Sequence, residues 1–114
     1  GDVKVIFSSD AGESFGEPIM IDNEFPIGRV DLVMLDESSA MVSWLCKQGD
    51  QTLIKAQIVH ISGQSEPALT IAESDASRAT GFPQMAKVGD KVYFAWTHLL
   101  EDKQTEIRLG SISW

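Results

Sequence analysis

The feature that most constrains the fold is a polar turn at residues 8–15 (SSDAGESF), which separates two apolar runs. A tight turn between strands leaves backbone N–H groups that no ladder reaches, and a short acceptor such as Asp10 can bond amides a few residues on. Gly12 can adopt positive φ at little steric cost. Ser8 and Ser14 bring hydroxyls to the two ends of the turn. The segment therefore predicts a β-hairpin centred on Asp10.

At Ser8, Asp10, Gly12, Ser14 and Phe15 the segment resembles the Asp-box, or BNR repeat, whose signature is Ser/Thr-x-Asp-x-Gly-x-Ser/Thr-Trp/Phe. The resemblance implies a turn between the third and fourth strands of a β-propeller blade, as in sialidases and many non-enzymatic propellers. In that family the box lies at the blade periphery, so these five residues are expected to be structural, with the Phe15 ring folded beneath the turn. It also implies an extracellular or periplasmic location. The alternative is an ordinary Asp-Ala-Gly hairpin loop.

Closely spaced turn signals divide the rest of the chain into short strands and leave no convincing helical segment. This spacing indicates an all-β sandwich or propeller. The predicted strands are 3–8, 17–21, 29–35, 40–46, 53–61, 68–72, 83–88, 91–98 and 105–112.

Two of these strands are apolar on both faces. Val42 and Trp44 point to one side of their strand, and Met41 and Leu45 point to the other. A strand of this kind needs cover on both sides, whereas a simple two-sheet sandwich shows polar residues outward. The pattern, repeated around Phe94, favours propeller blades stacked face to face.

A weak internal repeat points the same way. Residues 42–45 (VSWL) resemble residues 94–97 (FAWT), 52 positions later. A period near 50 residues suits a four-stranded propeller blade. The alternative is chance recurrence in a β-rich sequence.

The repeat divides the chain into three parts. Residues 1–21 are predicted to end one antiparallel four-stranded blade, residues 22–72 to form a complete blade, and residues 73–114 to form most of a further blade. About two blades of an incomplete ring are therefore expected. Because propellers close with about four to eight blades, the expected partners are the remaining blades of a parent propeller or further copies of this chain.

Charge restricts the other partners. The formal net charge is −8, from 17 acidic and 9 basic residues. A negative surface argues against nucleic acid and anionic membranes. No apolar run approaches the roughly 20 residues of a membrane span, so no membrane insertion is expected. Carbohydrate is left as a possible ligand class.

The sequence does not supply a sialidase active site. Such a site needs several arginines for the substrate carboxylate, a tyrosine nucleophile paired with glutamate, and an aspartate acid/base. The chain has only Arg29, Arg78 and Arg108, and it lacks the Phe/Tyr-Arg-Ile/Leu-Pro motif of the family. Tyr93, the sole tyrosine, is expected to pack in a strand. We therefore expect no catalytic residue here.

The best candidates for ligand contact are Arg29, Asp31 and Arg78, which lie near the starts of the innermost strands. In propellers that end lines the ligand-binding face. Contact with a neighbouring blade, an Arg29–Asp31 ion pair or a solvated loop arginine are the alternatives.

Metal and cofactor sites are not expected. His60 and His98 have no second ligand at metal spacing. Cys46, the only cysteine, is expected to be a small buried hydrophobe.

The sequence thus predicts a non-catalytic scaffold or a ligand- or carbohydrate-binding segment of a BNR/Asp-box, sialidase-like β-propeller. One alternative is a fragment of a sialidase-type glycoside hydrolase whose catalytic residues lie on other blades. A second alternative is a small β-sandwich adhesion domain.

Overall fold

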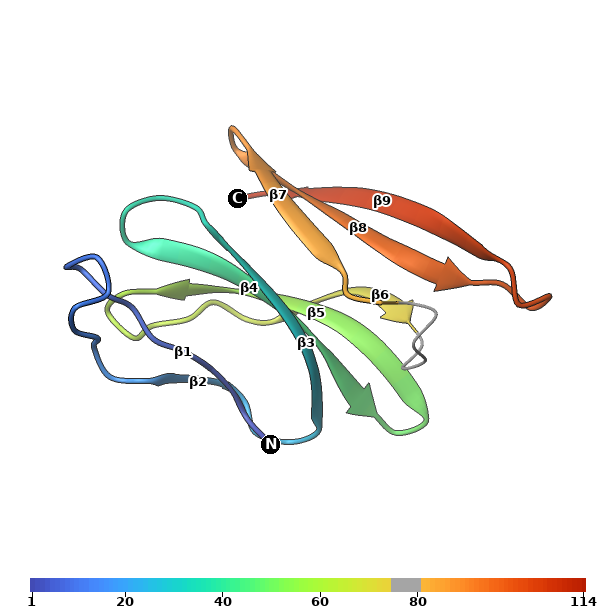
Figure 1. Ribbon diagram of the computed structural model, residues 1–114, viewed down its shortest axis with the longest axis horizontal. Helices are drawn as coiled ribbons and strands as arrows, with labels where there is room; N and C mark the ends of the chain where they lie inside the picture. The colour runs from blue at the N-terminus through green and yellow to red at the C-terminus, as the bar shows by residue number, and fades with distance from the viewer. Residues whose placement is uncertain (75–80) are drawn as a thin grey trace.

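The computed structural model describes residues 1–74 and 81–114, and within these ranges the chain is all-β, with nine strands and no helix (Figure 1). The all-β prediction is confirmed. Every pairing between neighbouring strands is antiparallel. The strands are β1 (Val3–Val5), β2 (Ile19–Asp22), β3 (Pro26–Met34), β4 (Ser39–Gln48), β5 (Gln51–His60), β6 (Leu69–Ser74), β7 (Gln84–Val88), β8 (Lys91–Leu99) and β9 (Thr105–Ser113).

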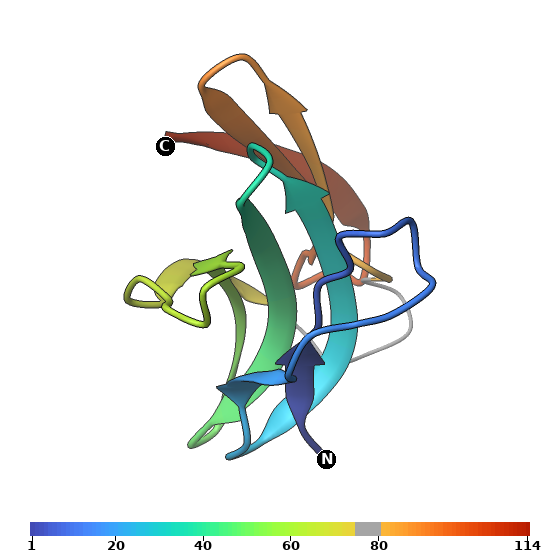
Figure 2. The same ribbon diagram turned by 90° about the vertical axis from the view of Figure 1, so that its left-hand side faces the viewer.

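These strands form three separate sheets, each a simple meander in chain order. The N-terminal sheet contains β1 and β2, the central sheet contains β3 to β6, and the C-terminal sheet contains β7 to β9. The central sheet lies between the other two, as the views in Figures 1 and 2 show. The described strands form no closed ring.

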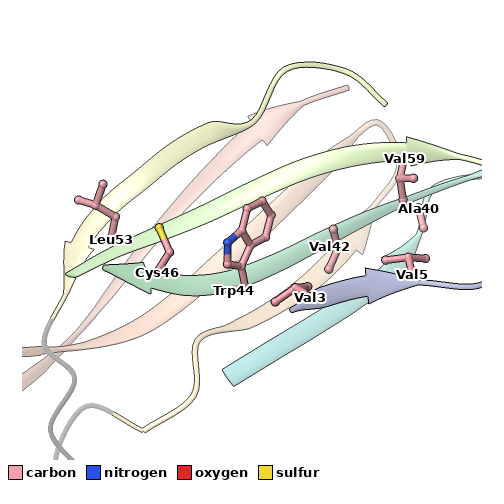
Figure 3. Close-up of a cluster of buried hydrophobic side chains, with 8 residues drawn as sticks. All are labelled: Val3, Val5, Ala40, Val42, Trp44, Cys46, Leu53 and Val59. Atoms are coloured by element: carbon pink, nitrogen blue, oxygen red, sulfur yellow. The ribbon is translucent and has the colours of Figure 1, made fainter. Parts of the chain in front are cut away.

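Two apolar clusters hold these layers together, one on each face of the central sheet. Trp44 and Val42 belong to the first cluster, with Val3 and Val5 of the N-terminal sheet (Figure 3). Met41 belongs to the second cluster, whose other members include residues of the C-terminal sheet. Because successive side chains of a strand point to opposite faces, β4 contributes to both clusters and is buried from residue 39 to residue 46.

The C-terminal sheet turns one face toward the central sheet. Val92 and Phe94 of β8 are buried in the second cluster, and Met85, Trp96 and Ile112 pack around them. Burying a side chain of this size contributes about 2 to 3 kcal/mol relative to exposure. The second cluster therefore holds the C-terminal sheet against the central sheet.

A bulge shapes the start of β3, where the register with β4 shifts on both sides of Gly28. Gly28 has a φ of +97° and Arg29 has a φ of +53°. The left-handed region suits glycine, but it is rare for a side chain such as that of arginine. Bulges redirect side chains, and this one precedes the polar contacts of Arg29 and Asp31 described below.

Candidate functional site

The turn at residues 8–15 is closed by side-chain hydrogen bonds centred on Asp10. The Asp10 Oδ1 atom accepts the Ser14 N–H at 2.8 Å and the Ser8 hydroxyl at 2.8 Å, and Oδ2 accepts the Ser14 hydroxyl. The Ser8 Oγ atom also accepts the Gly12 N–H at 2.8 Å. Gly12 has a φ of +89°. The two serines and the carboxylate thus replace ladder bonds that the turn cannot make.

This network changes the acidity of the Asp10 carboxyl. Hydrogen bonds from the Ser14 hydroxyl, the Ser14 N–H and the Ser8 hydroxyl lower the pKa of Asp10 from 3.8 to about 2. Each of these bonds favours the charged form of the carboxyl. Asp10 is therefore ionised at neutral pH and acts as a structural acceptor, not as a proton donor.

The Phe15 ring does not fold beneath the turn, and that expectation is wrong. The residue is 56% exposed. The N-terminal sheet has only two strands at this end, and Phe7 packs against its apolar cluster instead. Phe15 lies in the wall of a groove.

This groove has a volume of about 740 Å³ and separates the turn at residues 8–15 from the turn that follows β5. Serine hydroxyls, the Phe7 and Phe15 rings, several aliphatic side chains and the Glu17 carboxylate line its walls, so it combines polar and apolar contacts. The sequence analysis did not predict the groove, because its two walls lie about 50 residues apart in the chain. Its lining includes Ser9, Ser14, Phe15, Met20, Ile61, Ser62 and Ser65.

Arg29 and Asp31, predicted to contact a ligand or a neighbouring blade, lie at the contact between the central and C-terminal sheets. The Arg29 guanidinium donates to the carbonyl oxygen of Gly81 at 3.1 Å and lies 5.9 Å from the Phe82 ring centre. The Asp31 Oδ2 atom accepts the Met85 N–H at 2.8 Å. The bulge in β3 thus brings two charged side chains onto the segment that leads into β7.

The other predicted residues that the structure describes form no further site, and Arg78 is not among them because it lies outside the described residues. His60 lies 3.4 Å from a carboxylate oxygen of Glu66 in the turn after β5. Cys46 is buried, and burial raises the pKa of its thiol, so the thiol stays protonated and packs as an apolar group.

A polar contact that the sequence analysis missed joins the N-terminal and central sheets. The Trp44 indole Nε1–H donates to the Asp22 Oδ2 atom at 2.8 Å. Asp22 ends β2, and no local spacing links it to β4. The repeat gives no signal for this contact, because the 52-residue offset places Ser74 at the position that corresponds to Asp22.

Metal ligands do not gather in the part of the chain described here: no group of three or more His, Cys, Asp or Glu side chains is placed to hold an ion. The same ranges contain no helix of the length and apolarity that a membrane span requires.

Comparison with known proteins finds no matching protein-family model, no matching curated protein and no matching solved structure.

Proposed function

We propose that the chain is a non-catalytic scaffold segment of an extracellular or periplasmic BNR/Asp-box, sialidase-like β-propeller. The observation that carries this proposal is the burial of the central sheet on both faces. Val42 and Trp44 face one apolar cluster, and Met41 faces the other. A two-sheet sandwich leaves one face of each sheet to solvent, so this burial supports stacked blades over the adhesion-domain alternative.

The hydrogen bonds around Asp10 in the turn at residues 8–15 also support this proposal. Asp10 accepts bonds from both serines that flank it in the eight-residue segment. The turn joins β1 and β2, which in this proposal are the third and fourth strands of a blade. The central sheet is then the complete blade, and the C-terminal sheet supplies the first three strands of the next.

The arginines favour a scaffold over an enzyme fragment. Arg29 is engaged with Gly81 and Phe82. Arg108 pairs with Glu106, with 2.9 Å between Nη2 and Oε1. A sialidase needs several guanidinium groups directed at one substrate carboxylate, and these two make contacts within the protein instead.

A fluorogenic sialoside assay tests the non-catalytic part of this proposal. The purified chain is expected to release no fluorophore above the buffer blank across the range from mildly acidic to neutral pH. Release that scales with protein concentration and is lost on heat denaturation would overturn it. A known sialidase in the same plate controls for substrate quality.

Carbohydrate binding in the groove is a second candidate function. The observation that favours it is the combination of serine hydroxyls with the exposed Phe15 ring in one open cavity. Hydroxyls can bond sugar hydroxyls, and an aromatic face can pack on the apolar face of a sugar ring. Glu17 is the one charged residue in the lining of the groove, so a neutral sugar would suit it better than an anionic one.

An NMR titration with millimolar sialyllactose, and separately with lactose, tests this second function. Shifts are expected to concentrate in the two turns that form the groove. Phe15→Ala is expected to weaken binding about threefold to tenfold, which corresponds to the energy of one aromatic contact. Phe25→Ala is the matched control, because Phe25 is also an exposed phenylalanine and lies outside the groove. Absence of shifts, or equal effects of the two variants, would contradict it.

A further inference from the structure

The groove between the turn at residues 8–15 and the turn after β5 carries charge of one sign. Among the described residues that line it, Glu17 is the only charged one. The segments that form its walls, residues 7–20 and 61–66, contain three further carboxylates, from Asp10, Glu13 and Glu66, and no lysine or arginine. A cleft with charges of one sign concentrates ligands of the opposite sign. The groove therefore favours a cation.

The polar groups of the first wall are mainly hydrogen-bond acceptors. Hydrogen bonds from Ser14 and Ser8 lower the pKa of Asp10 to about 2, so this carboxylate keeps its charge at neutral pH. Ser14 donates its hydroxyl hydrogen to Asp10, so toward a ligand this hydroxyl can only accept, like the Glu17 carboxylate. An ammonium group has three donors and no acceptor. It therefore complements this wall better than a hydroxyl or a carboxylate does.

The two walls of the groove are held in place by the fold. Val5 of β1 and Val59 of β5 are buried in the first apolar cluster, each shortly before its turn begins (Figure 3). Backbone hydrogen bonds close both turns, and in the first the Gly16 N–H donates to the Phe7 carbonyl oxygen at 2.9 Å. The cavity of about 740 Å³ between them lies in the size range of small-molecule sites, which are usually largely preformed. The groove can thus admit a ligand without a large rearrangement.

The groove also offers an apolar surface next to its charge. Phe15 is 56% exposed, and Met20 and Ile61 line the groove with it. An aromatic ring can pack on the apolar face of a sugar, and the face of such a ring also attracts a cation. A ligand that combines a pyranose ring with an ammonium group therefore uses both properties of Phe15 as well as the nearby Glu17 carboxylate.

We propose that the groove binds a sugar that carries a protonated amine, such as an oligosaccharide of glucosamine. Glu17 pairs with the ammonium group, the Phe15 ring packs on the pyranose, and serine hydroxyls bond the hydroxyls of the ring. This inference rests on the proposed carbohydrate-binding function and adds the charge of the ligand to it. It ranks sugars by charge: an amino sugar binds more tightly than a neutral sugar, and a neutral sugar more tightly than an acidic one.

Polyamines and basic peptides share the charge of an amino sugar but not the rest of its chemistry. The lining of the groove combines the hydroxyls of Ser9, Ser14, Ser62 and Ser65 with the exposed Phe15 ring. Hydroxyls can bond the hydroxyls of a sugar, and the aromatic ring can pack on its flat apolar face. A lysine peptide has neither feature in its charged side chains. Trilysine therefore serves as a probe for charge alone.

NMR titrations with two related disaccharides are the test. Chitobiose, the disaccharide of glucosamine, has a free amine on each ring, and N,N′-diacetylchitobiose has the same rings and linkage with both amines acetylated. In mildly acidic buffer, where the free amines are protonated, chitobiose is expected to bind about two to five times more tightly. The shifts are expected in both turns that form the groove. Sodium chloride is expected to reduce the preference, because it screens the attraction between exposed charges.

Two matched variants assign the preference to the groove. Glu17→Gln removes the charge with almost no change of shape and is expected to abolish most of the preference for chitobiose. Glu101→Gln is the control, because Glu101 is an exposed glutamate in the turn between β8 and β9 and does not line the groove. It changes the net charge of the chain by the same amount and is expected to keep the wild-type preference. Resonances outside the groove show that each variant is folded.

Equal affinities for the two disaccharides, or a preference that survives Glu17→Gln, would overturn this inference and leave carbohydrate binding in the groove standing. Trilysine that binds in the groove as tightly as chitobiose would also overturn it, since charge alone would then be sufficient. Absence of shifts with both disaccharides would overturn the carbohydrate-binding function together with this inference. None of these results bears on the non-catalytic scaffold, which the sialoside assay tests separately.

Discussion

The two faces of the central sheet are covered by apolar clusters that are accompanied by different polar contacts. Toward the N-terminal sheet, an apolar cluster surrounds Trp44, whose indole N–H donates to Asp22. Toward the C-terminal sheet, the corresponding tryptophan, Trp96, packs against the second cluster, but its buried Nε1 atom has no hydrogen-bond partner in the described part of the chain. Polar contacts at that face come instead from Asp31 and Arg29 at the bulge of β3.

The two contacts share a packed tryptophan and differ in whether the indole N–H has a hydrogen-bond acceptor. Both pack a tryptophan from the second strand of a sheet against the sheet that precedes it. Among the described residues, only the N-terminal contact supplies an acceptor for the indole. In the central sheet, the residue 52 positions after Asp22 is Ser74. A buried donor without a partner costs about 1 to 3 kcal/mol, so the C-terminal contact is expected to be the weaker of the two.

Replacing each tryptophan by phenylalanine gives the largest expected contrast. Trp44→Phe removes a hydrogen bond to a carboxylate and is expected to lower the free energy of unfolding by about 2 to 3 kcal/mol. Trp96→Phe removes a buried donor that has no partner among the described residues and is expected to cost about 1 kcal/mol or less. Urea denaturation of both variants measures the difference. Equal losses would contradict the asymmetry between the two contacts.

Asp31→Ala tests the hydrogen bond between Asp31 and the Met85 N–H at the C-terminal contact. It leaves the Met85 N–H without its acceptor, and the expected loss is about 1 to 2 kcal/mol. Amide hydrogen exchange is expected to quicken in β7 and β8 while β1 and β2 keep their wild-type rates. Asp31→Asn keeps a side-chain carbonyl oxygen and serves as the conservative control, with a smaller effect. Uniform acceleration across all three sheets would show that Asp31 acts on the whole fold instead.

The sequence was sufficient to predict an all-β fold because the spacing of turns and the two-sided apolarity of β4 are local patterns. Met41 and Val42 are adjacent and both apolar, and this alone predicts cover on both faces of the strand. The structure has sheets on both sides. The positive φ of Arg29 was not predictable from the residue type, since arginine gives no signal for the left-handed region.

The candidate sites were less predictable because they depend on pairs of residues far apart in the chain. The 52-residue offset places residues 28–30 opposite residues 80–82, but this correspondence does not reveal that Arg29 donates to the carbonyl oxygen of Gly81. The bond between Trp44 and Asp22 spans 22 positions and has no periodic signature. The expectation for Phe15 was wrong because it presumed a covered site beneath the turn, and cover is a property of the whole assembly of strands.

Ser74→Asp tests whether a hydrogen-bond acceptor for the Trp96 indole N–H would strengthen the C-terminal contact. Ser74 and His98 line one small cavity, and His98 lies two positions beyond Trp96 on the same face of β8. A carboxylate at position 74 is expected to accept the Trp96 indole N–H and to raise the free energy of unfolding by up to about 1 kcal/mol. The gain is expected to vanish in the Trp96→Phe background, which a double-mutant cycle measures. A gain that persists there would assign the effect to some other contact.

The turn centred on Asp10 is exposed, so its expected effect on global stability is the smallest, but it has a distinct pH signature. The folded-state pKa of Asp10, about 2, lies below the ordinary value of 3.8. The ionised carboxyl therefore contributes stability that is fully present above about pH 4 and is lost as the pH falls toward 2. An NMR titration of the Asp10 carboxyl carbon is expected to give a midpoint near 2. Ser14→Ala removes the hydroxyl that lowers this pKa most and is expected to move the midpoint back toward 3.8.

Asp36 provides the internal control for that titration. Its pKa is also lowered, by the Ser38 N–H and the Ser39 hydroxyl, in the turn between β3 and β4. Because Ser14 takes no part in that turn, the Asp36 midpoint is expected to stay the same in Ser14→Ala. A shift of both midpoints would indicate a general change in the fold or in the charge of the chain. A wild-type Asp10 midpoint at its ordinary value would mean that the carboxylate does not hold this turn closed in solution, and the N-terminal sheet would then depend on the first apolar cluster and the bond between Trp44 and Asp22 alone.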